Sequence, residues 1–354
     1  MASSPSIQTE RPKTGPPIDA VYTWIDATDE ARLAQREEWL THYKMSESDR
    51  RLPVDPVDGN PKHTELYFSL HTLKVFAPWL RKIWIVTQRP QVPSFLGEFP
   101  RASVVHHDQI FRDGHVLPTF SSRAIETNLH RIPGLTEHFI YLNDDMFLGQ
   151  PLTPSDFFLE TASGHLPILR TVKRWKPSRS SPRSLALHLQ YAEELQTVVS
   201  KRDNAYVNSN RRVHTWLNEN FVRDPLRSNL AHQATPLTIS LIDAAIRRLP
   251  EEWDLMESLR FRHSDSMSPL PLALFLALYQ GQAVVLSHER DRLKRAWGSA
   301  DNGDLMRRVL KERPHLFCLN DLGPHLGEAT VRIYWRGLHK IIKEAYEAQG
   351  ISTG

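Results

Sequence analysis

Residues 138–145 read HFIYLNDD, a mostly apolar run followed at once by one amide and two carboxylates. The run predicts a short buried strand at residues 138–142. In open α/β sheets ligands bind outside the carboxyl ends of the strands, so Asn143, Asp144 and Asp145 are expected at such a mouth. Adjacent ionised carboxylates repel, and a divalent cation would offset that cost. The structural alternative is that Asp144 caps a turn while Asp145 is solvated, because Asp and Asn are common turn residues.

The chain on the amino-terminal side of this stretch alternates β-prone runs with helical periodicity. Strands are predicted at residues 18–25, 83–87 and 103–106, and helices at residues 65–76 and 122–131. Strands joined by crossover helices predict an α/β fold with a largely parallel sheet. Aromatic Tyr22 and Trp24 share one face of the first strand, where core packing and stacking on a base are both open interpretations.

The chain on the carboxyl-terminal side becomes helical in pattern after about residue 185. Helices are predicted at residues 185–199, from a cap at Thr235 with Pro236 at the first position, and at residues 331–346. The second half is therefore expected to pack helices over the sheet. Asn320 and Asp321 follow an apolar run and repeat the pattern of a strand that ends in an acid.

The composition is that of a globular protein with a sizeable core: 354 residues, 40% of them hydrophobic and 24% charged. A net charge of +3 is too balanced to imply general nucleic-acid binding. The longest apolar stretch, residues 269–278, falls well short of the roughly 20 residues of a membrane-spanning helix. A single cysteine, Cys318, excludes an internal disulfide and a CxxC metal site.

Residues 1–17 lack the apolar core of a secretory signal and are expected to be a disordered leader, so a cytoplasmic protein is predicted. Residues 173–183 (KRWKPSRSSPR) form a basic stretch rich in Pro and Ser. We interpret it as a surface loop, either a solvated connection or an arm for an anionic acceptor or the inner membrane surface.

Several motifs together resemble the Stealth proteins. They are PIDAVYTWIDATD (17–29), the segment 64–87 ending in KIWIVT, LPTFSSRAIETNLHRIPGLTEHFIYLNDDMFLG (117–149), LAHQATPL (230–237), FRHSD (261–265) and HLFCLND (315–321). The four conserved blocks of that family occur in order over about residues 17–325. Stealth proteins are hexose-1-phosphate transferases of microbial capsule polymers and include the catalytic subunit of the lysosomal-enzyme N-acetylglucosamine-1-phosphotransferase.

The resemblance implies a phosphotransferase that moves a hexose or N-acetylhexosamine 1-phosphate from a nucleoside diphosphate sugar, most simply a UDP-sugar, to a saccharide hydroxyl. The nucleoside monophosphate is released, in capsule or cell-surface polysaccharide synthesis, with Mg²⁺ or Mn²⁺ as cofactor. Two other classes stay open: a metal-dependent glycosyltransferase that releases the diphosphate, and a homologue that binds a nucleotide sugar without turnover.

The implied architecture is a Rossmann-like, GT-A-resembling sheet in residues 18–160, which binds the nucleotide sugar. A variable basic loop and helix follow in residues 161–215. A mainly helical region, residues 216–348, completes one catalytic unit. The oligomeric state is not predicted.

Candidate site residues follow from these patterns and the resemblance. Glu126 is the expected base, in the first turn of a helix capped by Ser122, with an i+4 pair to His130 as its structural alternative. His232 and Arg262 are family positions suited to proton transfer and phosphate binding, although Arg262 could pair with Asp265. The remaining candidates are, for the donor, Asp26, Trp24, Gln88, Arg89 and Ser122, and for the metal, Asp144, Asp145 and Asp321, with Asp145 also counted as catalytic.

The chain departs from the family pattern at four positions. Tyr67 and His71 stand where arginines are usual, Ala27 stands for a glycine, and Gln109 stands for an acid, with Asp108 one place earlier. A different donor, or compensation by Arg89 or His63, is therefore expected.

Overall fold

A computed structural model describes residues 15–43, 64–162, 164–170, 230–262, 267–286, 293–299, 303–320 and 328–350. Most of the predicted leader lies outside these residues, as do the basic stretch 173–183, the predicted helix 185–199, His63, Asp265 and Asp321.

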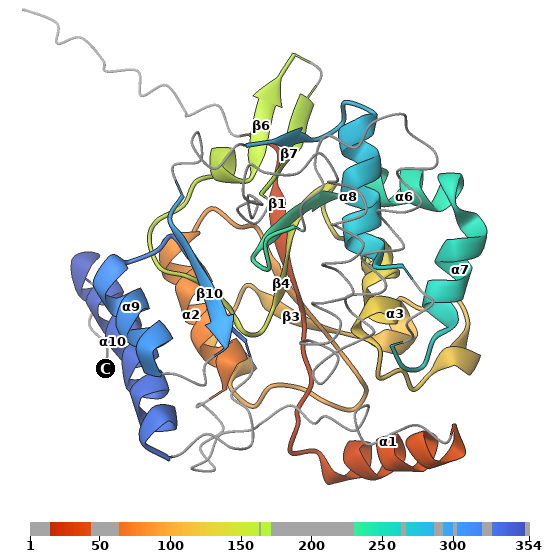
Figure 1. The fold of residues 1–354 in the computed structure, drawn as a ribbon, viewed down its shortest axis with the longest axis horizontal. Coiled ribbons are helices and arrows are strands. Elements are labelled where there is room, and N and C mark those ends of the chain that lie inside the picture. Colours follow the sequence, from red (N-terminus) through yellow and green to blue (C-terminus); the bar gives the residue numbers. More distant parts are fainter. Residues whose placement is uncertain are drawn as a thin grey trace, which may run out of the picture.

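A five-stranded sheet forms the centre of the molecule, in the order β3-β2-β1-β4-β8 (Figure 1). The strands β1 (Ile18–Thr23), β2 (Ile83–Thr87), β3 (Ala102–His106) and β4 (His138–Asn143) run parallel, while the edge strand β8 (Thr235–Thr238) is antiparallel to β4. The register of β1 with β4 ends at Thr23 beside Asn143, so the carboxyl ends of these two strands coincide. The predicted α/β fold with a mostly parallel sheet is confirmed.

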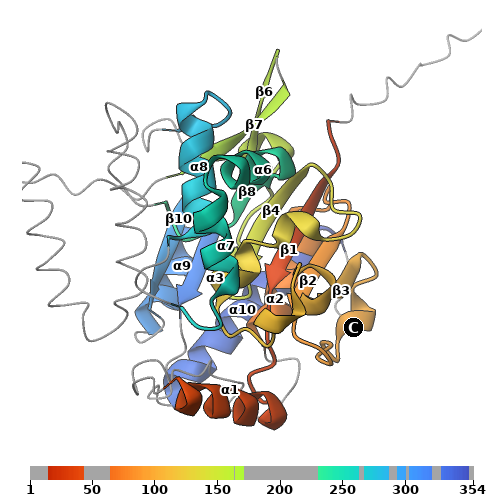
Figure 2. The same ribbon diagram turned by 90° about the vertical axis from the view of Figure 1, so that its right-hand side faces the viewer.

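Helices cover the two faces of the sheet (Figure 2). One hydrophobic cluster joins the first face to α2 (Glu65–Phe76), α9 (Gly303–Glu312) and α10 (Glu328–Ala348). A second cluster joins the other face to α3 (Ser122–Glu126), α6 (Ile239–Arg248), α7 (Pro250–Ser258) and α8 (Pro269–Tyr279). Along β1, Ala20 and Tyr22 belong to the first hydrophobic cluster and Val21 to the second, as the two-residue period of a strand requires. The sheet is therefore buried on both faces.

Local capping explains where the helices begin. Thr64 accepts a hydrogen bond from the backbone N–H of Tyr67, and α2 then runs over the predicted residues. Asp29 accepts from the N–H of Arg32 at the start of α1 (Glu30–His42). Both caps follow the preferred residue types for a helix N-terminus.

The carboxyl-terminal half is mainly helical, as expected, and also contains short strands. β10 (Arg295–Ser299) pairs with β11 (Leu316–Asn320), and β11 pairs with β5 (Met146–Leu148) in a second sheet. A third sheet contains β6 (Phe158–Thr161), β7 (Gly164–Leu169) and β9 (Val284–Val285). The apolar run before Asn320 is β11, as its strand-like pattern indicated, while the shorter runs carry too few residues to show their period.

Two predicted helices were wrong in their bounds. Thr235 does not cap a helix, because Thr235–Thr238 is the edge strand β8, where Pro236 is tolerated, and α6 begins after Thr238. The predicted helix 122–131 is only α3, followed by a separate 3₁₀ turn at Leu129–Arg131, and its cap is Ser121 rather than Ser122. The side chains of Thr127 and Asn128 bond back to the carbonyl of Ala124 and end α3 early.

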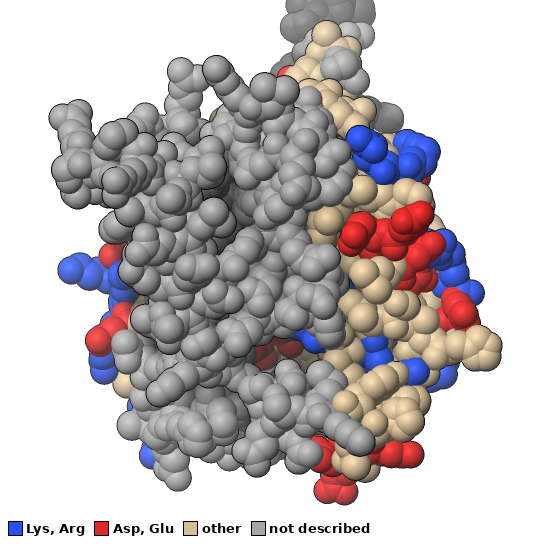
Figure 3. All heavy atoms as spheres, turned by 45° about the vertical axis from the view of Figure 1, so that its right-hand side comes forward, with Lys and Arg blue, Asp and Glu red and all other residues tan. Residues whose placement is uncertain are grey.

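The surface of the described residues carries charges of both signs. In Figure 3 the acidic side chains gather beside basic ones. The ends of the helices α6 and α7 show the same mixture, because α6 ends with Arg247 and Arg248 and α7 begins with Glu251 and Glu252. Among the described helices none has the length and apolarity that crossing a bilayer would require.

Candidate active site

The NDD motif forms the connection between two sheets. Asn143 ends β4, Asp144 and Asp145 make a two-residue turn, and Met146 begins β5. The turn is tied to the second sheet, because the N–H of Leu319 donates to the carbonyl of Asp145 at 3.1 Å. Both carboxylates therefore stand at the carboxyl edge of the central sheet, as predicted from the sequence.

A second acid, Glu126, reaches the same edge from the end of α3. The hydroxyl of Tyr141 on β4 donates to Glu126 Oε1 at 3.3 Å and lies 2.8 Å from Asn143 Oδ1 and 2.9 Å from Thr23 Oγ1. Burial raises the pKa of Glu126 to about 7, although the charges of Arg262 and Arg123 and the bond from Tyr141 act in the opposite direction. This carboxyl is thus poised to exchange a proton near neutral pH.

Arg262 joins this corner from the loop after α7. Its Nη2 donates to Ser122 Oγ at 2.8 Å, and its charge lowers the pKa of Glu126. The alternative that Glu126 pairs with His130 does not fit, because burial, followed by the charge of Arg131, lowers the pKa of His130 to about 4. A neutral imidazole offers no charge to Glu126. The other alternative partner, Asp265, lies outside the described residues.

The residues after Glu126 are held rigidly by α7. The indole N–H of Trp253 donates to the carbonyl of Thr127 at 3.0 Å, and Trp253 is fully buried. Arg131 bridges Asn128 and the buried Glu257 of α7. These contacts fix the end of α3, and with it the position of the Glu126 carboxylate.

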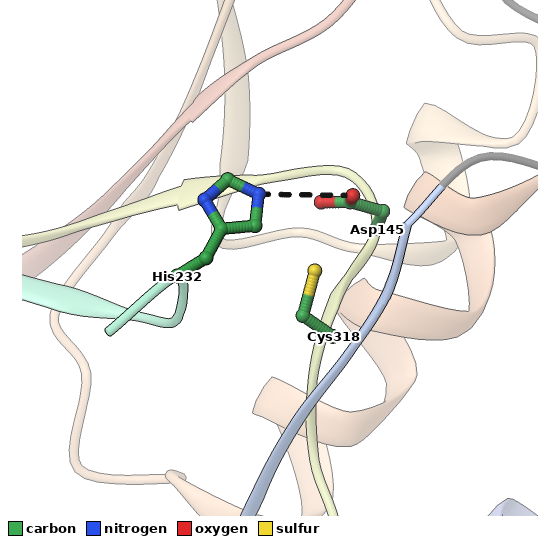
Figure 4. Close-up of side chains that lie close together, drawn as sticks. All are labelled: Asp145, His232 and Cys318. Carbon is green, nitrogen blue, oxygen red and sulfur yellow. Dashed lines mark ion pairs between the residues drawn. The ribbon is translucent and has the colours of Figure 1, made fainter. Parts of the chain in front are cut away.

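His232 approaches the NDD turn from the segment before β8 (Figure 4). Its Nε2 lies 4.0 Å from Asp145 Oδ2, and the two side chains are 35% and 15% exposed. Cys318 of β11 completes the group, and its sulfur and the other two ligand atoms all lie within 4.8 Å of one another. An imidazole, a carboxylate and a thiol in this arrangement could hold a metal ion.

Cys318 is the least suited of the three to bind a metal. Burial, followed by the neighbouring Asp145, raises the pKa of its thiol well above the usual value. The thiol therefore stays protonated, and a hard cation such as Mg²⁺ prefers oxygen ligands. The third predicted acid, Asp321, lies outside the described residues, although β11 leads the chain toward the turn.

The candidates for donor binding lie along the same edge but not beside Glu126. Asp26 accepts two hydrogen bonds from Thr28, Gln88 donates to Gln35 at 2.8 Å, and Arg89 pairs with Asp108 at 3.1 Å. The side chain of Trp24 is 8% exposed and packs in the first hydrophobic cluster. Of these candidates only Ser122 contacts the corner that holds Glu126.

Three of the positions that depart from the family pattern make contacts with neighbouring side chains or backbone. Tyr67 and His71 pack against each other with ring centroids 4.6 Å apart and contact the ring of Phe99. His71 Nδ1 also lies 2.9 Å from the hydroxyl of Tyr346 on α10. Gln109 accepts from the N–H of His106 in the turn after β3. The two positions without arginine therefore belong to an aromatic cluster.

Sequence reasoning missed Tyr141 and Cys318 as members of the site. Tyr141 was assigned to the strand 138–142, and its hydroxyl gives no periodic signal. The block HLFCLND brought Asn320 and Asp321 to notice, while Cys318 lies two residues before that pair on the same strand. Two-residue spacing along a strand marks a shared face, and this signal could have included Cys318.

Comparisons with known proteins agree with the motifs. The model of Stealth protein CR2, conserved region 2, matches residues 61–165. An exopolysaccharide phosphotransferase of Streptomyces coelicolor is 33% identical over 86% of this chain and 51% of its own length. The capsular polysaccharide phosphotransferase fcs1 of Haemophilus influenzae is 29% identical over 86% of this chain and 78% of its own length. The chain thus spans about half the length of the Streptomyces relative.

Among solved structures, the bifunctional glycosyltransferase WbbM matches with a TM-score of 0.40 at 8% identity, over 96% of this chain and 52% of the other. A TM-score this low does not establish a common fold.

Proposed function

Because the chain belongs to the Stealth family, we propose that it transfers a hexose 1-phosphate from a nucleoside diphosphate sugar to a saccharide hydroxyl. The nucleoside monophosphate is the second product. The observation that supports this most is the gathering of Glu126, Arg262, Asp145 and His232 at one edge of the sheet, although they come from segments far apart in the chain.

The reaction forms a bond between the acceptor oxygen and the phosphorus next to the sugar. The bond from that phosphorus to the oxygen of the nucleoside monophosphate breaks, and the hydroxyl proton goes to Glu126. A pKa of about 7 suits this role, since the base is ionised at neutral pH yet still accepts a proton. Phosphoryl transfer otherwise depends on positioning and on spreading negative charge over cations.

Arg262 is the cation whose charge acts most strongly on the carboxyl of Glu126. Its Nη2 is fixed on Ser122, so the guanidinium stands beside the base and can fork onto phosphate oxygens. The hydroxyl of Tyr141 contacts both the carboxylate of Glu126 and the amide oxygen of Asn143. His232 is placed to take or give a proton near Asp145.

We further propose that Asp144 and Asp145, with Asp321 as the residue that follows β11 in the sequence, hold Mg²⁺ or Mn²⁺. The donor set fits a cation, because the Asp145 carboxylate lies 4.0 Å from the imidazole of His232 and Asp144 is its neighbour in the same turn. Such an ion would neutralise the charge of the donor diphosphate. A UDP-sugar donor, a capsule-type acceptor and a cytoplasmic location are parts of the same proposal.

The test is the identity of the nucleotide released by the purified protein. UDP, GDP and CDP sugars are incubated with Mg²⁺ or Mn²⁺ and a saccharide acceptor, and the products are separated by ion-exchange chromatography. Release of the monophosphate, lost with a chelator, is expected. Release of the diphosphate would instead identify a glycosyltransferase, and the absence of product with every donor and acceptor would favour a binding protein.

A further inference from the structure

Arg32 on α1 and His107, directly after β3, are buried side by side with unsatisfied nitrogens. Arg32 is 6% exposed and His107 is 3% exposed. Within the described part of the chain, Nε and Nη1 of Arg32 and both ring nitrogens of His107 have no hydrogen-bond partner. Burial, followed by the charge of nearby Arg32, lowers the pKa of His107 to about 3, so its ring is neutral and carries one N–H donor.

The carboxylates near Arg32 and His107 are engaged elsewhere. Asp29 Oδ1 accepts from the backbone N–H of Arg32, and its Oδ2 accepts from the amide of Gln91 at 2.7 Å. Asp108 is paired with the guanidinium of Arg89 at 3.1 Å. Burying a guanidinium without a partner is costly, and burial lowers the pKa of Arg32 to about 10 without discharging it at neutral pH. Asp29 acts on the guanidinium through its charge, but no described residue accepts a hydrogen bond from Nε or Nη1 of Arg32.

Aromatic rings line this pair and connect it to the candidate active site. The ring of Phe120 lies 5.3 Å from Arg32 Cζ, and the ring of Phe111 lies 6.1 Å from that of His107. Phe120 is followed directly by Ser121 and Ser122, the cap and first residue of the helix that carries Glu126. The pair therefore borders the same edge of the sheet, next to the loop that leads into α3.

We propose that Arg32 and His107 form an oxyanion subsite that binds a phosphate or carboxylate group of a substrate. Two oxygens of such a group accept from Nε and Nη1 of Arg32, and one oxygen accepts from the N–H of His107. Because the proposal deepens the proposed transfer reaction, two sources share this chemistry: the diphosphate of the donor and an acidic group of the acceptor.

The test measures anion binding without turnover. Inorganic pyrophosphate is titrated against the full chain in the presence of EDTA, so that binding through a metal at Asp145 is removed, and the melting temperature is followed. The melting temperature is expected to rise to a plateau with increasing pyrophosphate in the wild type and in Asp145→Asn. Arg32→Met and His107→Leu should bind about tenfold to a hundredfold more weakly. Arg307→Met, which removes a 62% exposed arginine on α9, should bind like the wild type.

Stability without anion separates a binding role from a structural one. Arg32→Met replaces a buried charge, whose Nε and Nη1 have no hydrogen-bond partner, with an apolar side chain of similar length, so its melting temperature should equal or exceed that of the wild type. A lower melting temperature together with an unchanged response to pyrophosphate would overturn the proposal. No response in the wild type would overturn it as well, whatever nucleotide the transfer assay releases.

A second titration identifies the source of the anion. UDP and a glucuronic-acid oligosaccharide are compared in the wild type and in Arg32→Met. Weaker UDP binding in the variant assigns the subsite to the donor, and weaker oligosaccharide binding assigns it to the acceptor. Equal affinities of both proteins for both ligands would contradict a substrate subsite.

Discussion

The corner around Glu126 and the corner around Asp145 share one edge of the sheet but are built in different ways. Glu126 receives a hydrogen bond from a buried tyrosine, stands beside Arg262, and is the last residue of a helix that α7 holds in place. Asp145 lies in a turn between two sheets, and its nearest imidazole is 4.0 Å away, beyond hydrogen-bond distance. The first corner is arranged to exchange a proton, and the second gathers side chains that a cation could bridge.

The two corners therefore differ in what they need for activity: the protein alone tunes Glu126, whereas Asp145 would act together with a bound cation. The pKa of Glu126 is already tuned by burial and neighbouring charges. Asp145 and His232 come from two different segments and lie 4.0 Å apart, so a cation held at Asp145 would complete this corner. Substitutions should therefore act on ion binding at one corner and on proton transfer at the other.

The largest effect is expected at the metal corner. Asp145→Asn removes a charged ligand and should lower the rate of monophosphate release about ten-thousandfold, because an ion supplies several kcal/mol of charge stabilisation. Steady-state assays over a range of Mn²⁺ concentrations measure this change. Asp304→Asn, on an 80% exposed side chain, is the control and should leave the rate unchanged. A rate for Asp145→Asn within about threefold of the wild type would remove Asp145 from the site.

Glu126→Gln should lower the rate about a thousandfold, since it removes the general base and leaves the ion site intact. The metal affinity, measured from the metal concentration that stimulates the residual rate, should not change. Glu347→Gln, on the 59% exposed end of α10, is the matched control. A fall in metal affinity with normal turnover at saturating metal would reverse the roles assigned to the two corners.

The pH dependence follows from the same carboxyl. The wild-type rate should fall about tenfold per unit below pH 7, where Glu126 is protonated, and this acid limb should vanish in Glu126→Gln. The pKa is raised from 4.5 to about 7, so its stabilising contribution is full below 4.5 and is lost as the pH rises through 7. Denaturant unfolding at about pH 8 should show Glu126→Gln at least as stable as the wild type. Lower stability of the variant at that pH would contradict the raised pKa.

Tyr141→Phe should lower kcat about tenfold, because the carboxylate of Glu126 loses a hydrogen bond that holds it in place. The same bond lowers the pKa of Glu126, so the acid limb should move to higher pH in the variant while KM changes little. Tyr346→Phe removes a hydroxyl that contacts His71 on the far face of the sheet and should leave the profile unchanged. A change in KM alone would mean that Tyr141 contacts the substrate instead.

The smallest effect is expected for Cys318→Ser. The thiol is buried and protonated, so its replacement should change the rate with Mg²⁺ less than about threefold. Assays with Mg²⁺ and Zn²⁺ in parallel measure the effect. Loss of activity with every metal would show that the sulfur is a ligand and that the metal corner differs from the proposed oxygen-rich one.

The sheet and the first helices could be predicted because their signals are local. The runs at Ile83–Thr87 and Glu65–Phe76 are apolar or amphipathic over enough residues to show their period. The predicted helix bounds were wrong at two places. Side-chain hydrogen bonds of Thr127 and Asn128 end α3 early, and the segment with Pro236 is an edge strand. Those outcomes depend on contacts with β4 and α7, which the local pattern does not contain.

The sequence by itself determined the parallel sheet, the acids at the end of β4 and the likeness to Stealth phosphotransferases, because strand period and motif spacing are written along the chain. Only the tertiary structure decided that Tyr141 bonds to Glu126, that Cys318 stands beside Asp145, and that Arg32 and His107 are buried together without an acceptor. Burial, pKa and hydrogen bonding depend on which distant segments pack against a side chain, and that information exists only after folding.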